Sequence, residues 1–318
     1  MTEADSSLDS DWLENALGKL ARGEPSTLEG LLTSFGEVIS VPGTKAYCRT
    51  HFVVKDTSGI PRIDALARYL AFQVVDYCIP RKILHQAELA DQRTGSHRNI
   101  ARLADDARNL FAKMKYSGEN GEILLFTLLE TVLKIPQILC KMSLKTNSNV
   151  HIHGSDGIHA KYEHGVLALY WGESKLHASV NSAIDECFES LAPFLTEKDR
   201  ATARQDLFLI RNNLDAGSED VTAALIRYFD EDDAMSAKLE FRAACLIGFD
   251  LDKYPDAPSD EAKEMSEEIA RSIEVWTDRM KAQIEFCGVQ SFEIEIFCLP
   301  FPSVAEFRAA FLKLVVPN

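Results

Sequence analysis

Apolar residues recur along this chain at two spacings, and each spacing predicts a different kind of element. Repeats of three to four residues are typical of helices that bury one face, whereas strict alternation over short runs is typical of strands. We expect helices over residues 8–21, 63–78, 98–115, 123–133, 178–191, 197–214, 218–229, 260–286 and 304–315. We expect strands over residues 46–55, 137–144, 158–162, 166–175, 240–249 and 291–299. This mixed order predicts an α/β fold (mixed α+β), in which a central mixed sheet is flanked by helices.

A predicted β-hairpin near the middle of the chain ends in charged residues. Residues 166–175 begin with apolar side chains on both faces, which is typical of a central strand. Glu173 and Lys175 lie on one face at its end, because strand side chains repeat every two residues. A charged pair at that position costs free energy unless it is well paired or used in function.

The helix expected over residues 123–133 precedes this hairpin and is apolar nearly all round. Such a helix is typical of a buried position. Gly118 and Gly121 predict a turn before it, and Glu122 lies in its first turn. The carboxylate of Glu122 can therefore face outward at the start of a core helix.

Composition limits the classes of protein that this chain can belong to. Its 318 residues, 46% of them apolar, suffice for one large domain or two smaller ones. We expect an N-terminal α/β region over 1–115 and a core over 116–318 with a helical insertion around 192–235, and the two can equally pack as one domain. No apolar run approaches the ~20 residues that span a bilayer. The start of the chain lacks the pattern of a signal peptide, so we expect a cytoplasmic protein without membrane contact.

The seven cysteines are scattered and contain no CxxC pair. We therefore expect reduced, buried thiols rather than disulfides or a zinc site.

Charge is distributed unevenly along the chain, whose formal net charge is −15. Residues 81–115 carry a net charge of +4, whereas residues 215–268 carry −11. The basic stretch contains Arg98, Arg102 and Arg108, which are candidate DNA contacts or, alternatively, a solvated helix face. The acidic stretch is either a solubilising surface or a face that repels DNA and docks on a basic partner.

Charged residues around the hairpin form a candidate metal-dependent active site. Asp156 lies at the start of the hairpin, and Glu173 could join it as a second carboxylate ligand of a metal ion. Mg²⁺ prefers oxygen ligands, so the backbone carbonyl of Ser174 could add a third ligand, and Glu122 could add a fourth or hold a metal-bound water. Lys175 could orient the attacking water or stabilise charge on a phosphate. The structural alternative is a buried pair of Glu173 with Lys175 beside an unrelated turn residue.

Histidines cluster near Asp156 and offer two further interpretations. His159 is a candidate for a supporting role in the same site, or a polar core residue. His151 and His153, two residues apart on a strand, could place two imidazoles on one side for a transition metal.

The motifs Gly121-Glu122, Gly154-Ser155-Asp156-Gly157-Ile158-His159 and Gly172-Glu173-Ser174-Lys175 resemble those of the PD-(D/E)xK restriction-endonuclease-like superfamily, and more closely the HamA family of Hachiman anti-phage defence. The resemblance implies a restriction-endonuclease-like core and DNA cleavage, with Mg²⁺ as cofactor or Mn²⁺ as its substitute. It also implies a bacterial complex with a superfamily 2 helicase subunit (HamB-like), which restrains the nuclease until DNA is engaged. One departure is Ser155, which stands where the superfamily has a nominal proline.

Two other classes of function can be weighed from the residues. The chain lacks the GxSxG motif that carries the nucleophile of serine hydrolases. It also lacks the GK[ST] ending of a phosphate-binding loop, so we expect no NTPase activity in it. The alternative to a nuclease is a non-catalytic, acidic regulatory subunit of a helicase complex that acts through residues 215–268. The presence of Glu122, Asp156, Glu173 and Lys175 together argues against that alternative.

Overall fold

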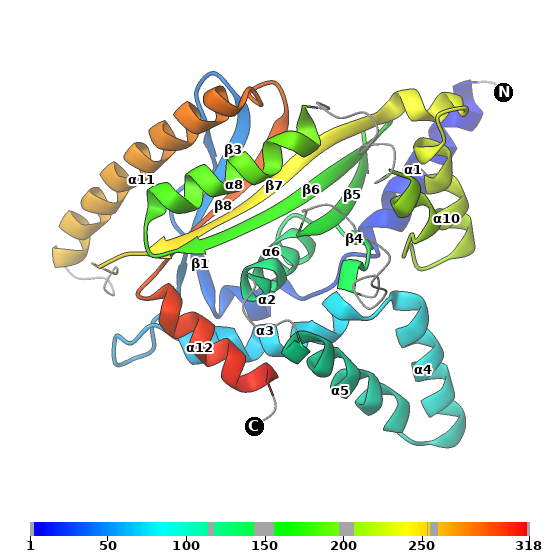
Figure 1. Cartoon of the computed structure of the whole chain (residues 1–318), viewed down its shortest axis with the longest axis horizontal. Helices are drawn as coiled ribbons and strands as arrows, with labels where there is room; N and C mark the ends of the chain where they lie inside the picture. The colour runs from blue at the N-terminus through cyan, green and yellow to red at the C-terminus, as the bar shows by residue number, and fades with distance from the viewer. Residues whose placement is uncertain are drawn as a thin grey trace.

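A curled, mixed β-sheet forms the centre of the protein (Figure 1). The computed structural model describes residues 3–113, 118–142, 156–196, 207–252, 254 and 260–316. Within these residues the strand order is β1-β3-β8-β7-β6-β5-β4, and β2 pairs with β3. The strands are β1 (Leu32–Ser34), β2 (Ile39–Ser40), β3 (Lys45–Val53), β4 (Gln137–Leu139), β5 (Gly157–Glu163), β6 (Val166–His177), β7 (Leu239–Asp250) and β8 (Glu293–Phe301).

The middle of the sheet is parallel and its two sides are antiparallel. Strands β3, β8, β7 and β6 run parallel to one another, whereas β1, β5 and β4 pair antiparallel with their neighbours. Most side chains of β6 and β7 are buried, as expected for parallel strands that are covered on both faces. The prediction of a mixed sheet flanked by helices is therefore confirmed.

Helices cover both faces of the sheet, and each face has its own apolar cluster. One cluster includes residues of α1 (Glu3–Gly18), α8 (Val180–Leu195), α10 (Glu219–Ile226) and α11 (Asp260–Cys287). The other includes residues of α2 (Pro25–Glu29), α3 (Ile63–Cys78), α5 (Arg98–Lys113), α6 (Glu119–Thr131) and α12 (Val304–Val315). In β6, Trp171 belongs to the first cluster and Tyr170 to the second, so the strand contributes side chains to both.

The remaining helices are peripheral. Helix α4 (Arg81–Thr94) lies beside α5, and the two form a pair that extends from the lower right of the molecule in Figure 1. Asp91 in α4 fixes the turn between them, because its carboxylate accepts hydrogen bonds from the amides of Asn99 and Ile100 at 3.0 Å each. Two short 3-10 helices, Arg227–Phe229 and Ala234–Lys238, lie between α10 and β7.

Most elements expected from the sequence are present, with four differences. The strand expected over 137–144 covers only Gln137–Leu139, and residues 141–142 are helical. Gly121, expected in a turn before α6, lies inside the helix, which begins at Glu119, whereas Gly118 immediately precedes it. The helix expected over 197–214 is partly outside the described residues, although residues 207–212 are helical. Helix α4 and the short strands β1 and β2 were not anticipated, because their apolar patterns are brief or irregular.

The regions expected over 1–115 and 116–318 contribute to the same sheet, because β3 of the first pairs with β8 of the second. All seven cysteines are free thiols, and six of them are buried, as expected. Among the described helices, none has the length and apolar character needed to cross a membrane.

Candidate active site

Asp156 lies at the point where β5 begins beside β6. The backbone amide of Asp156 donates a 2.8 Å hydrogen bond to the carbonyl of Gly172. Its side chain continues along β6, where Oδ2 accepts from the backbone amide of Ser174 at 2.8 Å and from the Ser174 hydroxyl at 2.7 Å. The carboxylate thus replaces the next strand residue as the partner of β6, and both of these hydrogen bonds are made by Oδ2.

The carbonyl of Ser174 faces the same edge of β6. Along a strand, the amide and carbonyl of one residue point to one side, and residues two apart share that side. The Gly172 carbonyl and the Ser174 amide both point toward Asp156, so the Ser174 carbonyl points that way as well. Strand β5 ends its pairing with β6 at Gly157 opposite Gly172, which leaves this carbonyl beyond the last ladder pair.

Glu173 and Lys175 form an ion pair at the end of β6. The Lys175 ammonium lies 2.7 Å from Glu173 Oε1, and the two side chains are 26% and 3% exposed, respectively. The second oxygen, Glu173 Oε2, is buried and has no hydrogen-bond partner among the described residues. A buried carboxylate oxygen without a donor costs free energy, and a cation is a suitable partner for it.

Glu122 approaches the strand from the first turn of α6. Tyr77, in the last turn of α3, donates its hydroxyl hydrogen bond to Glu122 Oε2 at 2.5 Å, and the same hydroxyl lies 3.2 Å from the carbonyl of Asp156. The helix lies close to the strand because Gly121 has no side chain. A Cβ atom at Gly121 would lie only 3.0 Å from the hydroxyl oxygen of Ser174.

The carboxylates reach the edge of β6 from different sides. Strand alternation directs Ser174 toward α6, and it directs Glu173 and Lys175 toward the face that α8 covers. Consistently, the thiol of Cys187 in α8 lies 3.7 Å from the backbone carbonyl of Glu173. In the described ranges, no three His, Cys, Asp or Glu side chains are gathered closely enough to hold a metal ion.

The available donor set for a metal is therefore two carboxylates and a carbonyl: Asp156, Glu173 and Ser174. This set fits Mg²⁺, which is commonly held by one or two carboxylates and keeps several waters. Glu122, predicted as a fourth ligand or as a holder of metal-bound water, accepts a hydrogen bond from Tyr77, and its charge acts on both other carboxylates.

Burial and like charge perturb these groups. Burial raises the pKa of Asp156 well above its usual value, and the charges of Glu122 and Glu173 raise it further. Burial also raises the pKa of Glu173, although the hydrogen bond from Lys175 opposes this. Burial alone would lower the pKa of Lys175, but its hydrogen bond with Glu173 outweighs that effect and the pKa is raised. Lys175 is thus a cation at neutral pH.

Two residues of this site were not predicted from the sequence. Tyr77 holds Glu122 but lies 45 positions before it, in a helix whose pattern indicates only core packing. Lys141 is buried just after β4, and its positive charge lowers the pKa values of Asp156 and Glu173. A lysine within an otherwise apolar run, QILCKM, was the only available signal for Lys141.

The C-terminal end of α6 is held by ion pairs between buried charged side chains. Glu130, in its last turn, accepts hydrogen bonds from the Arg22 guanidinium at 2.7 and 2.8 Å and from Arg81 at 3.2 Å. Arg81 also pairs with Asp215 at 3.2 Å. Since Glu122 and Glu130 lie two turns apart on one helix, this network holds the axis along which Glu122 is positioned.

The other predicted site residues lie elsewhere. His159 is buried, its Nδ1 lies 3.0 Å from the carbonyl of Ile135, and burial lowers its pKa to about 4, so it is neutral at physiological pH. Arg98, Arg102 and Arg108 lie on α5, where Arg102 pairs with Asp106 and Arg108 with Asp105. His151 and His153 lie outside the described residues.

The chain is similar to a known protein family. The sequence model of the HamA family matches residues 33–315, which include every residue of the candidate site. No curated protein matches the chain.

Proposed function

Because this chain belongs to the HamA family, the family of Hachiman anti-phage defence, we propose that it is the nuclease of such a system. In this proposal it is a divalent-metal-dependent deoxyribonuclease that hydrolyses phosphodiester bonds under the control of a helicase partner. The observation that supports the proposal is the end of β6, where Asp156 bonds to Ser174, and where neighbouring Glu173 pairs with Lys175 and has a buried oxygen without a hydrogen-bond partner among the described residues.

The metal would be held by Asp156, Glu173 and the Ser174 carbonyl. A bound Mg²⁺, or Mn²⁺ in its place, supplies charge neutralisation at the phosphate and lowers the pKa of water. The raised pKa of Asp156, and Glu173 Oε2 without a hydrogen-bond partner in the described part of the chain, are both signs of excess negative charge that a cation would relieve.

Lys175 and Glu122 supply the remaining chemistry. Lys175 is more exposed than Glu122 and Glu173, so its ammonium can reach a phosphate and stabilise the charge that develops during cleavage. Glu122, which accepts a hydrogen bond from Tyr77, would help to position the attacking water. Orientation of this kind contributes through positioning rather than through new bonds.

In this proposal, the net negative charge of the chain explains why its access to DNA depends on a partner. A protein of net charge −15 repels the phosphates of free DNA, and its association with DNA is slow unless another protein delivers the substrate. A helicase subunit that engages DNA would provide that delivery.

The alternative is a regulatory subunit that acts through the acidic residues 215–268. Several of these acids already have partners within the chain. Asp230 pairs with Arg211 at 3.0 Å, Asp233 pairs with Arg227 at 2.9 Å, and Asp215 is buried against Arg81. Acids neutralised in this way contribute less to a docking surface, which favours the nuclease as the first candidate.

Plasmid cleavage tests the proposal. The purified chain, alone and with its partner helicase, is incubated with plasmid and Mg²⁺ or Mn²⁺. We expect Lys175→Ala and Glu173→Ala to lower the cleavage rate by at least about a hundredfold while the complex still forms. Lys281→Ala is the matched control, because Lys281 forms an exposed pair with Glu285 on α11 at 2.9 Å. A Lys175→Ala protein that cuts as fast as the Lys281→Ala protein would refute the assignment.

A further inference from the structure

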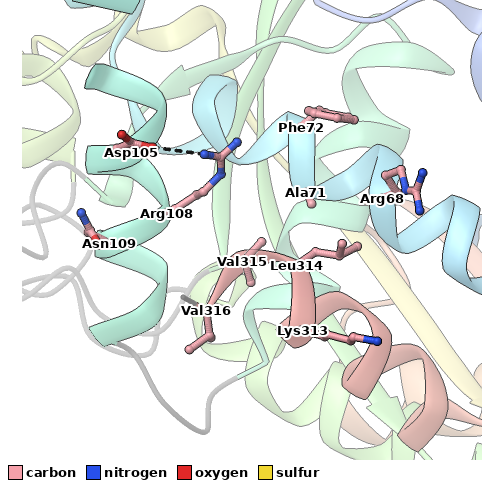
Figure 2. Close-up of a pocket in the computed structure, with 10 residues that line it drawn as sticks. All are labelled: Arg68, Ala71, Phe72, Asp105, Arg108, Asn109, Lys313, Leu314, Val315 and Val316. Atoms are coloured by element: carbon pink, nitrogen blue, oxygen red, sulfur yellow. Dashed lines mark hydrogen bonds and ion pairs between the residues drawn. The ribbon is translucent and has the colours of Figure 1, made fainter. Parts of the chain in front are cut away.

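A groove between helices α3, α5 and α12 shares no lining residue with the candidate active site. It has a volume of about 670 Å³, within the usual range of ligand sites. Figure 2 shows its three walls: Arg68 and Phe72 come from α3, Arg108 points from α5 toward α3, and Lys313 and Leu314 come from the end of α12.

The groove is basic in an acidic protein. Three cations line it, Arg68, Arg108 and Lys313, against one carboxylate, Asp105, while the chain as a whole has a net charge of −15. Arg108 pairs with Asp105 at 3.2 Å, but both side chains are well exposed, and such surface pairs are weak. Arg68 and Lys313 make no ion pair within the described part of the chain. This local excess of positive charge suits an anionic ligand.

Phe72 narrows the class of anion. Its side chain is 65% exposed although it is a large aromatic residue, and it lies one helical turn from Arg68 on α3. An exposed aromatic ring among cations is the arrangement on which nucleic-acid bases stack while the cations contact phosphates. Bases offer a free face only in a single strand, because a duplex stacks them against each other.

Two further cations lie on α5, although they point to other sides of the helix than Arg108. Arg102 and Arg98 precede Arg108 by six and ten residues, which places them about 9 and 15 Å further along the helix axis. The pairing of Arg102 with Asp106 is exposed and 3.8 Å long, so it leaves the guanidinium accessible. Arg98 and Arg102 are therefore additional cations on the same helix and not part of the groove lining.

We propose that the groove between α3, α5 and α12 binds a segment of single-stranded DNA. One base stacks on Phe72, and the neighbouring phosphates lie beside Arg68, Arg108 and Lys313. The choice of DNA over RNA rests on the proposed nuclease function, whereas the single-strand preference rests on the groove itself.

Fluorescence anisotropy with the full-length chain tests this proposal. The probe is a fluorescein-labelled oligothymidylate of about twelve nucleotides, in EDTA at about 50 mM salt, so that binding is measured without cleavage. We expect Phe72→Ala to weaken binding about tenfold, and the double variant Arg68→Glu with Lys313→Glu to weaken it more than about tenfold. All three side chains are exposed, so the fold should be retained, which thermal melts will verify.

Matched controls separate the groove from general effects. Phe286→Ala removes an exposed phenylalanine on α11, and Lys19→Glu with Lys238→Glu makes the same change in net charge at exposed sites outside the groove. The proposal is overturned if the groove variants weaken binding no more than these controls, or if the wild-type chain does not bind the probe. A duplex of the same length bound as tightly as the single strand, or an RNA strand bound about tenfold tighter, would also overturn it.

The outcomes distinguish this proposal from the nuclease proposal. Suppose that the groove variants lose probe binding but the wild-type chain cleaves no plasmid, even with its partner helicase. That result would support DNA binding by the groove and refute the nuclease proposal. If the wild-type chain cleaves plasmid but the groove variants bind the probe as tightly as their controls, the nuclease proposal is supported and DNA binding by the groove is refuted. If those variants instead lose the helicase partner, the groove is a protein-docking surface and does not bind DNA.

Discussion

Replacing Gly121 by alanine should disturb the active site more than it disturbs the fold. A Cβ atom at this position would lie 3.0 Å from the hydroxyl oxygen of Ser174, 3.2 Å from its Cβ and 3.3 Å from Cγ of Leu176. Ordinary contacts begin at 3.4 Å, so the two elements must separate by several tenths of an ångström. The Ser174 hydroxyl cannot rotate away freely, because it donates a 2.7 Å hydrogen bond to Asp156.

The cost to stability should be small, because two effects oppose each other. Overpacking by one methyl group costs about 1–3 kcal/mol, whereas alanine is favoured over glycine inside a helix by about 1 kcal/mol. The free energy of unfolding should therefore fall by about 0–2 kcal/mol. Activity should fall further, because Glu122 follows Gly121 directly and a displacement of about 1 Å in a catalytic group can cost about a hundredfold. For a shift of a few tenths of an ångström we expect about a tenfold loss.

The assay compares the initial rate of plasmid cleavage in Mg²⁺ with the melting temperature of the same preparation. Gly118→Ala is the control, because Gly118 precedes the same helix and a Cβ atom there would meet nothing within 4 Å. We expect the control to cleave at nearly the wild-type rate. If Gly121→Ala cleaves as fast as Gly118→Ala while both remain folded, the close approach of α6 to β6 does not position the site.

Two further predictions concern stability. The pKa of Asp156 is raised above its unfolded value of about 3.9, so the folded state binds this proton more tightly and loses stability as pH rises. The Asp156→Asn protein should therefore have a higher melting temperature than the wild type in EDTA at alkaline pH, and this difference should vanish at acidic pH. The same variant should not cleave DNA. A difference that grows toward acidic pH would contradict this sign. Glu130→Ala leaves Arg22 and Arg81 buried without their shared carboxylate, and should lower the free energy of unfolding in urea by about 3–5 kcal/mol. Glu285→Ala, which breaks only an exposed pair, should cost less than about 1 kcal/mol, and equal losses in the two variants would refute the importance of the network.

Local pattern was sufficient for the elements that carry the predicted motifs. Alternation and helical spacing are properties of neighbouring residues, so the hairpin of β5 with β6, the helix α3 and the terminal helix α12 could be predicted before any tertiary contact was known. The spacing of Glu173 and Lys175 on one strand likewise placed both on one face.

Only the tertiary structure decided which distant residues meet. The pairing of β3 with β8 joins segments more than 200 residues apart, and nothing in either strand specifies that partner. Tyr77 and Lys141 joined the site in the same way, through packing of α3 and β4 against α6 and β5. Side-chain pattern records which face of an element is buried, but not which other element covers it. The sequence therefore determined the catalytic candidates along one hairpin, and long-range packing determined how Glu122 is held, how the charges perturb one another, and where the basic groove lies.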